Sequence, residues 1–197
     1  MSQNNVRTLS RQELRKLWMN PEDERIHMLF KTTAKLGLRN SEAVTLQKKN
    51  LDLENQTVEV KNSKNDKSRT VPIPDNLLEE LRIYTQQLSP QEYLFPSKRS
   101  DSHLTPRAFQ KKVRKHSLEA GLYPTGITEE DVKEMPYEER IMPHSLRHSY
   151  ATIRLNEGQE MSKVKRLLGH ESIQTTVDQY YHLKIDDLKD AVNEIEI

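Results

Sequence analysis

The sequence predicts a mainly α-helical domain that carries one small antiparallel sheet of three strands. Over most of the 197 residues, apolar side chains recur every three or four positions between helix-capping residues. Only between residues 51 and 73 does the apolar pattern alternate as it does in strands. A chain of this length can bury one core, so we expect residues 1–197 to form a single domain with residues 1–8 flexible.

Three helices are expected before the sheet. Residues 10–13 form a capping box, and apolar residues follow it at helical spacing. Asn20-Pro21 is expected to open a second helix, because Asn is a good cap and a proline in the first turn loses no hydrogen bond. Gly37 is placed to end that helix. A short third helix is expected over residues 41–46, with Ser41 as its cap.

The sheet is predicted from two alternating segments, residues 57–60 and 69–73. Residues 62–68 connect them and are polar and rich in lysine, which is typical of a hairpin loop. Leu51 and Leu53 favour a short preceding strand. We therefore expect a three-stranded antiparallel sheet with lysines at the tip of one hairpin.

Helical spacing returns after the sheet. One helix is expected from Asp75 onward, and a second after the start signal Thr105-Pro106. Apolar side chains of the second helix face one way, and its basic side chains face the other way: Arg107, Lys111, Arg114 and Lys115. Residues 122–142 indicate an acidic surface insertion with one short helix, and Gly169 is placed to end a later one. The remaining helices are expected over residues 145–157, 162–168, 172–181 and, as a C-terminal tail, 183–197.

The distribution of charge is more informative than its sum. The chain holds 31 Lys and Arg against 30 Asp and Glu, yet residues 97–116 carry seven basic residues and one Asp. Acidic residues gather instead in the insertion and in the tail. Such a bipolar chain is compatible with a nucleic-acid partner despite its near-zero net charge. The absence of cysteine excludes disulfides and thiolate zinc sites, and no apolar run has membrane-span length, so we expect a cytoplasmic protein.

Three separated blocks carry residues suited to chemistry on phosphate. Arg39 stands between two predicted helices, and His144 and Arg147 lie three positions apart on one face of another. His170 follows the glycine that ends a helix, ten residues before Tyr180. Taken singly, each is more often a solvated helix end or a core aromatic. Their joint order and spacing favour a site.

This set suits phosphoryl transfer without a metal. Two guanidiniums can hold the non-bridging oxygens of a pentacoordinate transition state, and a histidine N–H can add a donor. A tyrosine hydroxyl, with an ordinary pKa near ~10, attacks well only in a cationic site or beside a base. A hairpin lysine can protonate the leaving 5′-oxygen. Metal-dependent nucleases would need clustered carboxylates.

These blocks resemble the motifs of the tyrosine recombinase (phage integrase) family over roughly residues 8–190. The matching segments are Leu38-Arg39-x-Ser41-Glu42, Ser63-Lys64-x-x-Lys67-x-Arg69, His144-x-x-Arg147-His148, Leu168-Gly169-His170 and Asp178-x-Tyr180-x-His182. The resemblance implies the fold of that family's catalytic domain. It also implies a catalytic set in which Tyr180 is the nucleophile and Lys64 the general acid: Arg39, Lys64, His144, Arg147, His170 and Tyr180.

The resemblance further implies site-specific cleavage and rejoining of DNA through a covalent 3′-phosphotyrosyl intermediate, without metal, ATP or another cofactor. The expected partner is double-stranded DNA in the nucleoid, bound by a tetramer that assembles on paired sites from free monomers, with no membrane. In the family, the segment after the nucleophile typically docks on a neighbouring protomer, and we expect this of the tail, with packing on its own domain as the alternative. The residues expected to contact DNA are Lys61, Lys67, Arg69, Arg107, Lys111, Arg114 and Lys115.

Some alternatives stay open. The hairpin lacks the glycines that commonly flank the family's lysine, so Lys61 or Lys67 competes with Lys64, and Tyr181 competes with Tyr180. The chain has no room for the separate helical clamp domain with which family members usually begin. A type IB topoisomerase-like nicking-closing enzyme would need the same chemistry without synapsis. A non-catalytic DNA-binding or regulatory relic is the remaining alternative, and the intact catalytic set argues against it.

Overall fold

The computed structural model describes residues 6–19, 23–61 and 68–169. This part is mainly helical and contains one three-stranded antiparallel sheet of order β1-β2-β3, which confirms the predicted fold class. None of its helices is long and apolar enough to cross a membrane. In chain order the elements are α1 (Arg11–Met19), α2 (Glu24–Leu36), α3 (Asn40–Val44), η1 (Lys48–Asn50), β1 (Leu51–Asp52), β2 (Thr57–Lys61), β3 (Ser68–Pro72), α4 (Asp75–Tyr84), α5 (Pro106–Glu119), α6 (Glu129–Glu134), η2 (Tyr137–Glu139), α7 (Pro143–Asn156) and α8 (Met161–Leu168).

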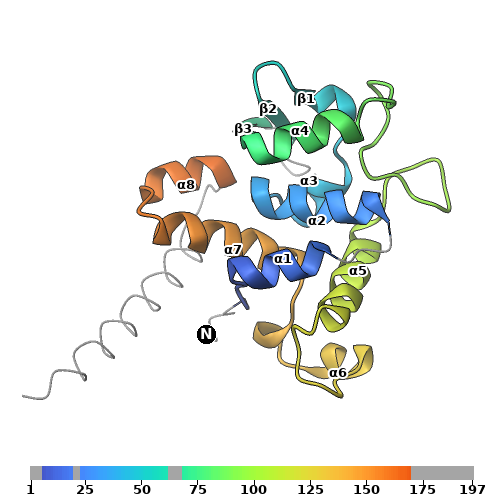
Figure 1. Cartoon of the computed structure of the whole chain (residues 1–197), viewed down its shortest axis with the longest axis vertical. Helices are drawn as coiled ribbons and strands as arrows, with labels where there is room; N and C mark the ends of the chain where they lie inside the picture. Colours follow the sequence, from blue (N-terminus) through green and yellow to red (C-terminus); the bar gives the residue numbers. More distant parts are fainter. Residues whose placement is uncertain (1–5, 20–22, 62–67, 170–197) are drawn as a thin grey trace, which may run out of the picture.

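Helix α2 lies at the centre of the described domain. It contacts α1, α3, α4 and α7, and in Figure 1 the sheet and α4 lie on one side of it and α5 on the other. Its apolar side chains Ile26, Leu29, Phe30 and Leu36 are fully buried, and Phe30 stacks on Phe109 of α5 with ring centroids 5.9 Å apart. Full burial of one such side chain contributes about 1.5–3 kcal/mol. This packing fixes the helices that carry the candidate site.

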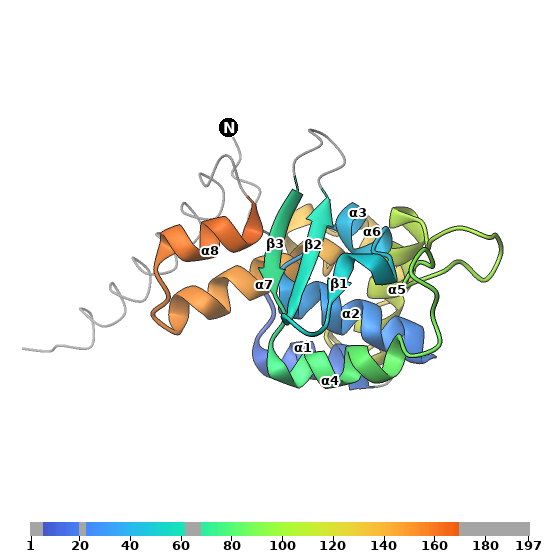
Figure 2. The same ribbon diagram turned by 90° about the horizontal axis from the view of Figure 1, so that it is seen from above.

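The sheet follows the predicted alternation. Strand β2 buries Val58 and Val60 and exposes Glu59 between them. Lys61 pairs with Ser68, the last pair of the β2–β3 ladder. Figure 2 shows the three strands side by side, with β3 next to α8, which it contacts. The sheet therefore brings the start of β3 close to the end of α8.

Helix starts depend on caps, and two differ from prediction. Helix α2 begins after Asp23, whose carboxylate accepts the backbone N–H of Ile26 at 2.9 Å. The predicted start at Asn20 was wrong, because Asp caps as well as Asn and stands next to the apolar stripe. Helix α3 begins at Asn40, one residue before the predicted cap Ser41.

The N-terminal segment packs more closely than expected. Val6 is buried, and Nη2 of Arg7 donates a hydrogen bond to the carbonyl of Leu122 at 2.7 Å. Residues 6–8 were predicted to be flexible, and these contacts with the insertion hold Val6 and Arg7 in place. The capping box over residues 10–13 is formed as predicted.

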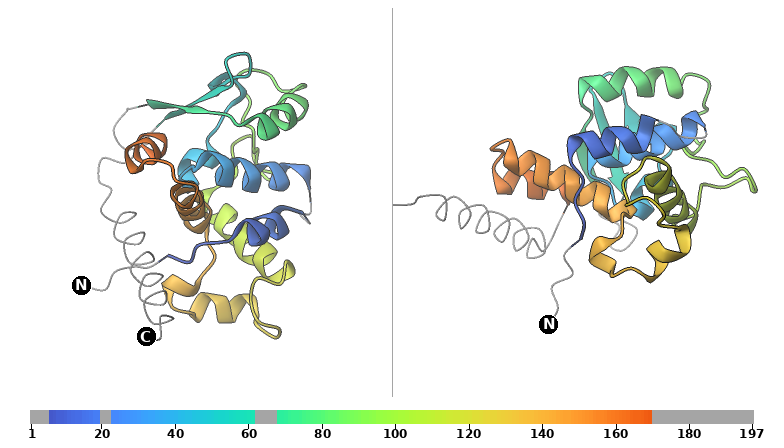
Figure 3. Two further views of the ribbon diagram at one scale, coloured as in Figure 1. Left: turned by 60° about the vertical axis from the view of Figure 1, so that its left-hand side comes forward. Right: turned by 60° about the horizontal axis from the view of Figure 1, so that its bottom comes forward.

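The insertion contains the predicted short helix, α6, and the turn η2. Helix α6 contacts α5, as the two views in Figure 3 show. The acidic insertion therefore lies beside the basic helix. The predicted helices over residues 172–181 and 183–197 lie outside the described residues.

Candidate active site

Arg39 and Arg147 meet at the C-terminal ends of two helices. Arg147 is 2% exposed. Its Nη1 donates to the carbonyl of Gly37 at 2.5 Å, and its Nη2 donates to the carbonyl of Leu168 at 2.7 Å. Nη2 of Arg39 donates to the carbonyl of Gly169 at 3.2 Å. Both guanidiniums thus lie where α2 and α8 end, and free backbone carbonyls there carry partial negative charge.

Two glycines make this arrangement possible. Gly37 has a φ of 61° and Gly169 a φ of 63°, left-handed values that end α2 and α8. A Cβ on Gly37 would lie 2.8 Å from side-chain atoms of both Leu168 and Tyr150. The glycines predicted as helix stops therefore also let the ends of α2 and α8 approach each other closely.

A buried glutamate joins the arginines. Glu42, whose side chain is 1% exposed, accepts from Nη1 of Arg39 at 2.8 Å and from the backbone N–H of Arg39 at 2.8 Å. Its Oε2 lies 3.7 Å from Nη1 of Arg147. Arg69 of β3 donates to both carboxylate oxygens, at 2.7 and 2.8 Å. One carboxylate thus contacts three guanidiniums from α3, β3 and α7.

The described part of this site carries more positive than negative charge. Burial raises the pKa of Glu42, but hydrogen bonds and charge from Arg69, and then from Arg39, lower it to about 2. Burial, followed by repulsion from Arg39, lowers the pKa of Arg147 to about 9. Arg147 therefore keeps its charge at neutral pH, and the site places three guanidiniums around one carboxylate. A site of low local dielectric with this excess attracts an anion such as a phosphodiester.

His144 lies beside the arginines and pairs with a second histidine. Its Nε2 lies 2.7 Å from Nε2 of His148, and the two rings meet edge to face. Burial, and then the charges of Arg147 and Arg39, lower the pKa of His144. The imidazole is therefore mainly neutral at neutral pH, and one ring of the pair donates while the other accepts. The pairing fixes the orientation of His144.

Of the six predicted catalytic residues, the structure brings three together: Arg39, His144 and Arg147. Lys64, His170 and Tyr180 lie outside the described residues, as does Lys67. In the sequence, His170 directly follows Gly169, and Lys64 stands between Lys61 and Ser68, the last pair of the β2–β3 ladder. Within residues 6–19, 23–61 and 68–169, no group of three or more His, Asp or Glu could hold a metal ion.

The predicted DNA-contact residues differ in their surroundings. Lys61, Arg107 and Lys111 are exposed, the first at the end of β2 and the others on α5. Nε of Arg114 lies 3.4 Å from Oε2 of Glu129 in α6, and Nζ of Lys115 lies 3.6 Å from Oε1 of Glu119. Arg69 is directed inward instead, since its Nε also donates to the carbonyl of Leu167 at 3.0 Å.

Two residues at the site had no role in the sequence analysis. Glu42 holds the arginines together, and its position three residues after Arg39 is the capping-box spacing that could have indicated a contact. His148 lies four residues after His144, so both fall on one helix face. Their partners could not be read from the sequence, because Glu42 contacts three separate segments.

Comparisons with known proteins agree with this geometry. The model of the phage integrase family matches residues 2–186. The tyrosine recombinase XerA of Thermococcus onnurineus is 30% identical over 190 residues, which cover 94% of this chain and 61% of that protein. XerD of Vibrio cholerae is 33% identical over 165 residues, 80% of this chain and 49% of XerD. The chain thus spans less than two thirds of the length of these relatives.

Solved structures show the same fold. A crystal structure of XerA recombinase matches with a TM-score of 0.74 and 25% identity, over 95% of this chain and 64% of that one. The recombinase XerH, solved as a post-cleavage complex with palindromic difH substrate, matches with a TM-score of 0.69 and 26% identity, over 95% of this chain and 53% of XerH. Among neighbours below 25% identity, the catalytic domain of bacteriophage HP1 integrase shares the fold, with a TM-score of 0.60 and 23% identity over 95% of this chain and 94% of that one.

Proposed function

Since the chain belongs to the phage integrase family, we propose that it is the catalytic domain of a tyrosine recombinase that cleaves and rejoins DNA at specific sites. The observation that carries the proposal is the arginine pair: Arg39 and Arg147 lie together on the carbonyl ends of α2 and α8, beside His144. Pre-positioned guanidiniums of this kind stabilise the negative charge that develops on a phosphodiester under attack.

The proposed reaction has two equivalent steps. Tyr180 gives its hydroxyl proton to a neutral histidine of the site, such as His144, and its oxygen attacks the phosphorus. A 3′-phosphotyrosyl bond forms, and the bond to the 5′-oxygen breaks. Lys64 gives a proton to that leaving oxygen, while the guanidiniums and a histidine N–H hold the non-bridging oxygens. Attack by the 5′-hydroxyl of a second strand then reverses the chemistry and releases the tyrosine. No nucleotide hydrolysis is needed, because one ester is exchanged for another.

A nicked suicide DNA tests the proposal, provided that it carries the sequence that flanks the gene of this protein. Cleavage releases a short fragment, so the covalent protein–DNA adduct accumulates and can be counted on a denaturing gel. We expect adducts with the native chain and none with Tyr180→Phe, while DNA affinity changes by only a few-fold, on the order of one lost hydrogen bond. Adducts that persist in Tyr180→Phe and vanish in Tyr181→Phe would move the nucleophile by one residue. No adduct with the native chain would contradict the proposed activity.

The general acid has its own test. A substrate with sulfur in place of the leaving 5′-oxygen needs no proton, so it should restore cleavage to Lys64→Ala but not to Arg147→Ala. If this substrate instead rescued cleavage in Lys61→Ala or Lys67→Ala and not in Lys64→Ala, the rescued position would be the general acid.

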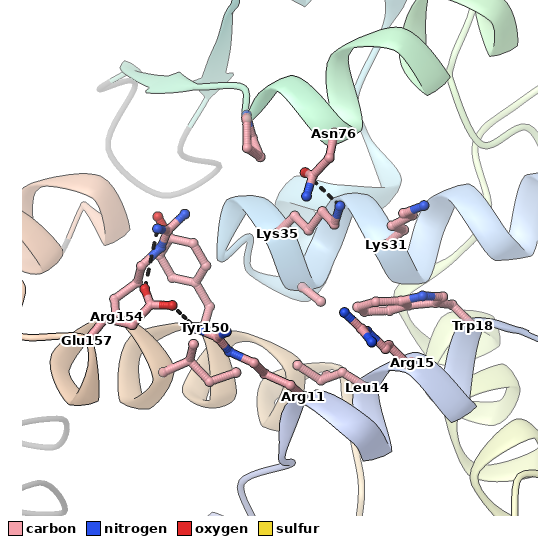
Figure 4. Close-up of a pocket in the computed structure, with 13 residues that line it drawn as sticks. Arg11, Leu14, Arg15, Trp18, Lys31, Lys35, Asn76, Tyr150, Arg154 and Glu157 are labelled. Atoms are coloured by element: carbon pink, nitrogen blue, oxygen red, sulfur yellow. Dashed lines mark hydrogen bonds and ion pairs between the residues drawn. The ribbon is translucent and has the colours of Figure 1, made fainter.

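We also propose that the protein assembles as a tetramer on paired DNA sites within the nucleoid, through its tail. A groove of about 500 Å³ supports this idea. Figure 4 shows Arg11 and Arg15 of α1, Lys31 and Lys35 of α2 and Arg154 of α7 around it, with Tyr150 at its wall. Burial, and then repulsion from the charges of Lys31 and Arg15, lower the pKa of Lys35, while the charge of Glu80 opposes this shift. The cations of the groove therefore repel one another.

The sequence of the tail is complementary to this groove. Residues 185–195 place Ile185, Leu188, Val192 and Ile195 at helical spacing among acidic residues. Truncation after Lys184 should weaken cooperative assembly more than it lowers the melting temperature of the monomer. Arg15→Glu should do the same, whereas Lys16→Glu, on the same helix but outside the groove, should not. A truncated protein that melts far lower and still assembles cooperatively would place the tail on its own domain.

A further inference from the structure

Each nitrogen of the Arg69 guanidinium donates a hydrogen bond inside the protein. Arg69 stands at the start of β3, next to the Lys61–Ser68 pair that closes the lysine hairpin. Its Nη1 and Nη2 donate to the two oxygens of Glu42 at 2.7 and 2.8 Å. Its Nε donates to the carbonyl of Leu167 at 3.0 Å. The side chain therefore ties β3 to α3 and to the last turn of α8.

Glu42 transmits this contact to the arginine pair. The same carboxylate accepts from Nη1 and from the backbone N–H of Arg39, each at 2.8 Å, and lies 3.7 Å from Nη1 of Arg147. Its burial means that water cannot replace a lost partner. Arg69 helps to fix the orientation of the carboxylate, because its two-pronged pair holds both oxygens, and the two contacts from Arg39 hold them from the other side of the same network.

The stem of Arg69 also sets the spacing at the end of α8. A Cβ on Gly169 would lie 2.6 Å from Cδ of Arg69, so the two residues are in direct contact. Gly169 in turn accepts from Arg39 through its carbonyl and directly precedes His170. Arg69 thus touches the segment that leads to one predicted catalytic residue and the hairpin that carries another.

We propose that Arg69 is a positioning residue for cleavage: through Glu42 it holds Arg39 and Arg147 in one geometry, and through Leu167 it fixes the end of α8 relative to β3. The inference rests on the proposed function. It replaces the direct DNA contact expected from the sequence, since each guanidinium nitrogen of Arg69 already donates to Glu42 or Leu167 and the side chain is directed inward.

The first measurement separates positioning from DNA contact. Arg69→Gln should slow adduct formation roughly 10- to 100-fold, the scale expected when catalytic groups are misplaced by about an ångström. The salt dependence of DNA binding should stay unchanged, because no phosphate contact is lost. Arg82→Gln is the matched control, since Arg82 also donates to a carbonyl, that of Leu53 at 2.8 Å, but lies on the surface of α4. A flattened salt slope with normal cleavage at saturating DNA would make Arg69 a DNA contact and overturn the proposal.

The second measurement asks whether Arg69 acts through Glu42. In Glu42→Gln, the further change Arg69→Gln should cost less than it does in the native chain, because only the contact with Leu167 is then lost, whereas independent roles would multiply the two losses. Arg69→Lys keeps the positive charge but cannot donate to both carboxylate oxygens in the planar geometry of a guanidinium. This variant should fold and show an intermediate loss of cleavage rate. Multiplied losses, or a native cleavage rate in Arg69→Lys, would overturn the proposal even if Arg69→Gln failed to fold.

A third measurement needs no activity. The groups that face Glu42 are Arg39, which precedes α3, Arg69 of β3 and Arg147 of α7. Loss of the Arg69 contact should raise the pKa of Glu42, so its carboxyl ¹³C resonance should titrate at higher pH in Arg69→Lys than in the native chain. An unchanged titration would contradict the inference. Because this signal is independent of cleavage, it still tests the Arg69–Glu42 link if the native chain forms no adduct.

Discussion

The candidate active site and helix α5 both gather positive charge, and they do so in opposite ways. At the candidate active site, Arg39 and Arg147 contact backbone carbonyls and the buried carboxylate of Glu42. On α5, by contrast, Arg107 and Lys111 are exposed to solvent. The first region fixes its cations before any ligand arrives. The second leaves its cations surrounded by water.

This difference predicts different functions for the same residue types. Fixed donors in a dry site stabilise a transition state, because they need not reorganise when charge develops. Solvated cations on a helix face contribute affinity by releasing counterions from DNA, and this contribution falls as salt rises. Changes at the first region should therefore reduce cleavage and stability, and changes at the second should reduce affinity and its salt dependence.

The largest effect is expected for Arg147→Ala. The change removes a charged donor from the reacting phosphate, so cleavage should fall on the order of 10²-fold or more. It also leaves the buried carbonyls of Gly37 and Leu168 without their donor, at about 1–3 kcal/mol for each group. Adduct formation and thermal melting should both drop, whereas Arg107→Ala on α5 should leave melting unchanged. Equal cleavage losses in the two variants would remove the distinction between the regions.

Gly169→Ala should have the next largest effect. A side chain at the φ of 63° costs roughly 1–2 kcal/mol, and the new Cβ would lie 2.6 Å from Cδ of Arg69. Gly158→Ala is the matched control, because Gly158 has a φ of 81° with no atom within 4 Å of such a Cβ. Both variants should melt lower, but only Gly169→Ala should slow cleavage, by roughly tenfold if the arginines shift by a fraction of an ångström. Identical cleavage rates in Gly169→Ala and Gly158→Ala would show that the contact between Gly169 and Arg69 has no effect on cleavage.

The sequence predicted these two regions to different depths. The amphipathic pattern of α5 gave its basic face directly, because exposure follows from helical periodicity alone. The arginine boxes identified Arg39 and Arg147, but not their partners. The role of Glu42 depends on the meeting of α3, β3 and α7, which no local pattern encodes. Arg69 was predicted to contact DNA as a cation beside the lysine hairpin, whereas alternation along β3 puts it on the same face as the buried Val71. Alternation gives the face of a side chain, but not the distant helix end that it meets.

The contribution of ionised Glu42 to the stability of the fold should depend on pH. Its pKa of about 2 in the folded protein lies below its ordinary 4.5, so the ionised group stabilises the fold above about pH 4.5. That contribution, on the order of 3 kcal/mol, should be lost as the pH falls from about 4.5 toward about 2. Urea unfolding against pH should therefore show a large stability difference between the native chain and Glu42→Gln at neutral pH, which shrinks in acid. A difference that stays constant through this range would mean that Glu42 is not ionised in the fold.

The smallest effects are expected on α5, where they sharpen the comparison most. Each phosphate contact contributes about 0.9 to the slope of log affinity against log salt. Arg107→Ala and Lys111→Ala should each flatten the slope by roughly that amount, while adduct formation at saturating DNA stays normal.

Arg114→Ala should flatten the slope less, because Nε of Arg114 lies 3.4 Å from Glu129 of the acidic insertion, and DNA has to displace that carboxylate. By the same reasoning, Glu129→Gln should strengthen DNA binding a few-fold at low salt, since the pair is worth about 0.2–1 kcal/mol. Unchanged slopes in all of these variants would mean that the basic residues of α5 are merely solvated and do not contact DNA. Of the arginine site and α5, only the arginine site would then act on DNA.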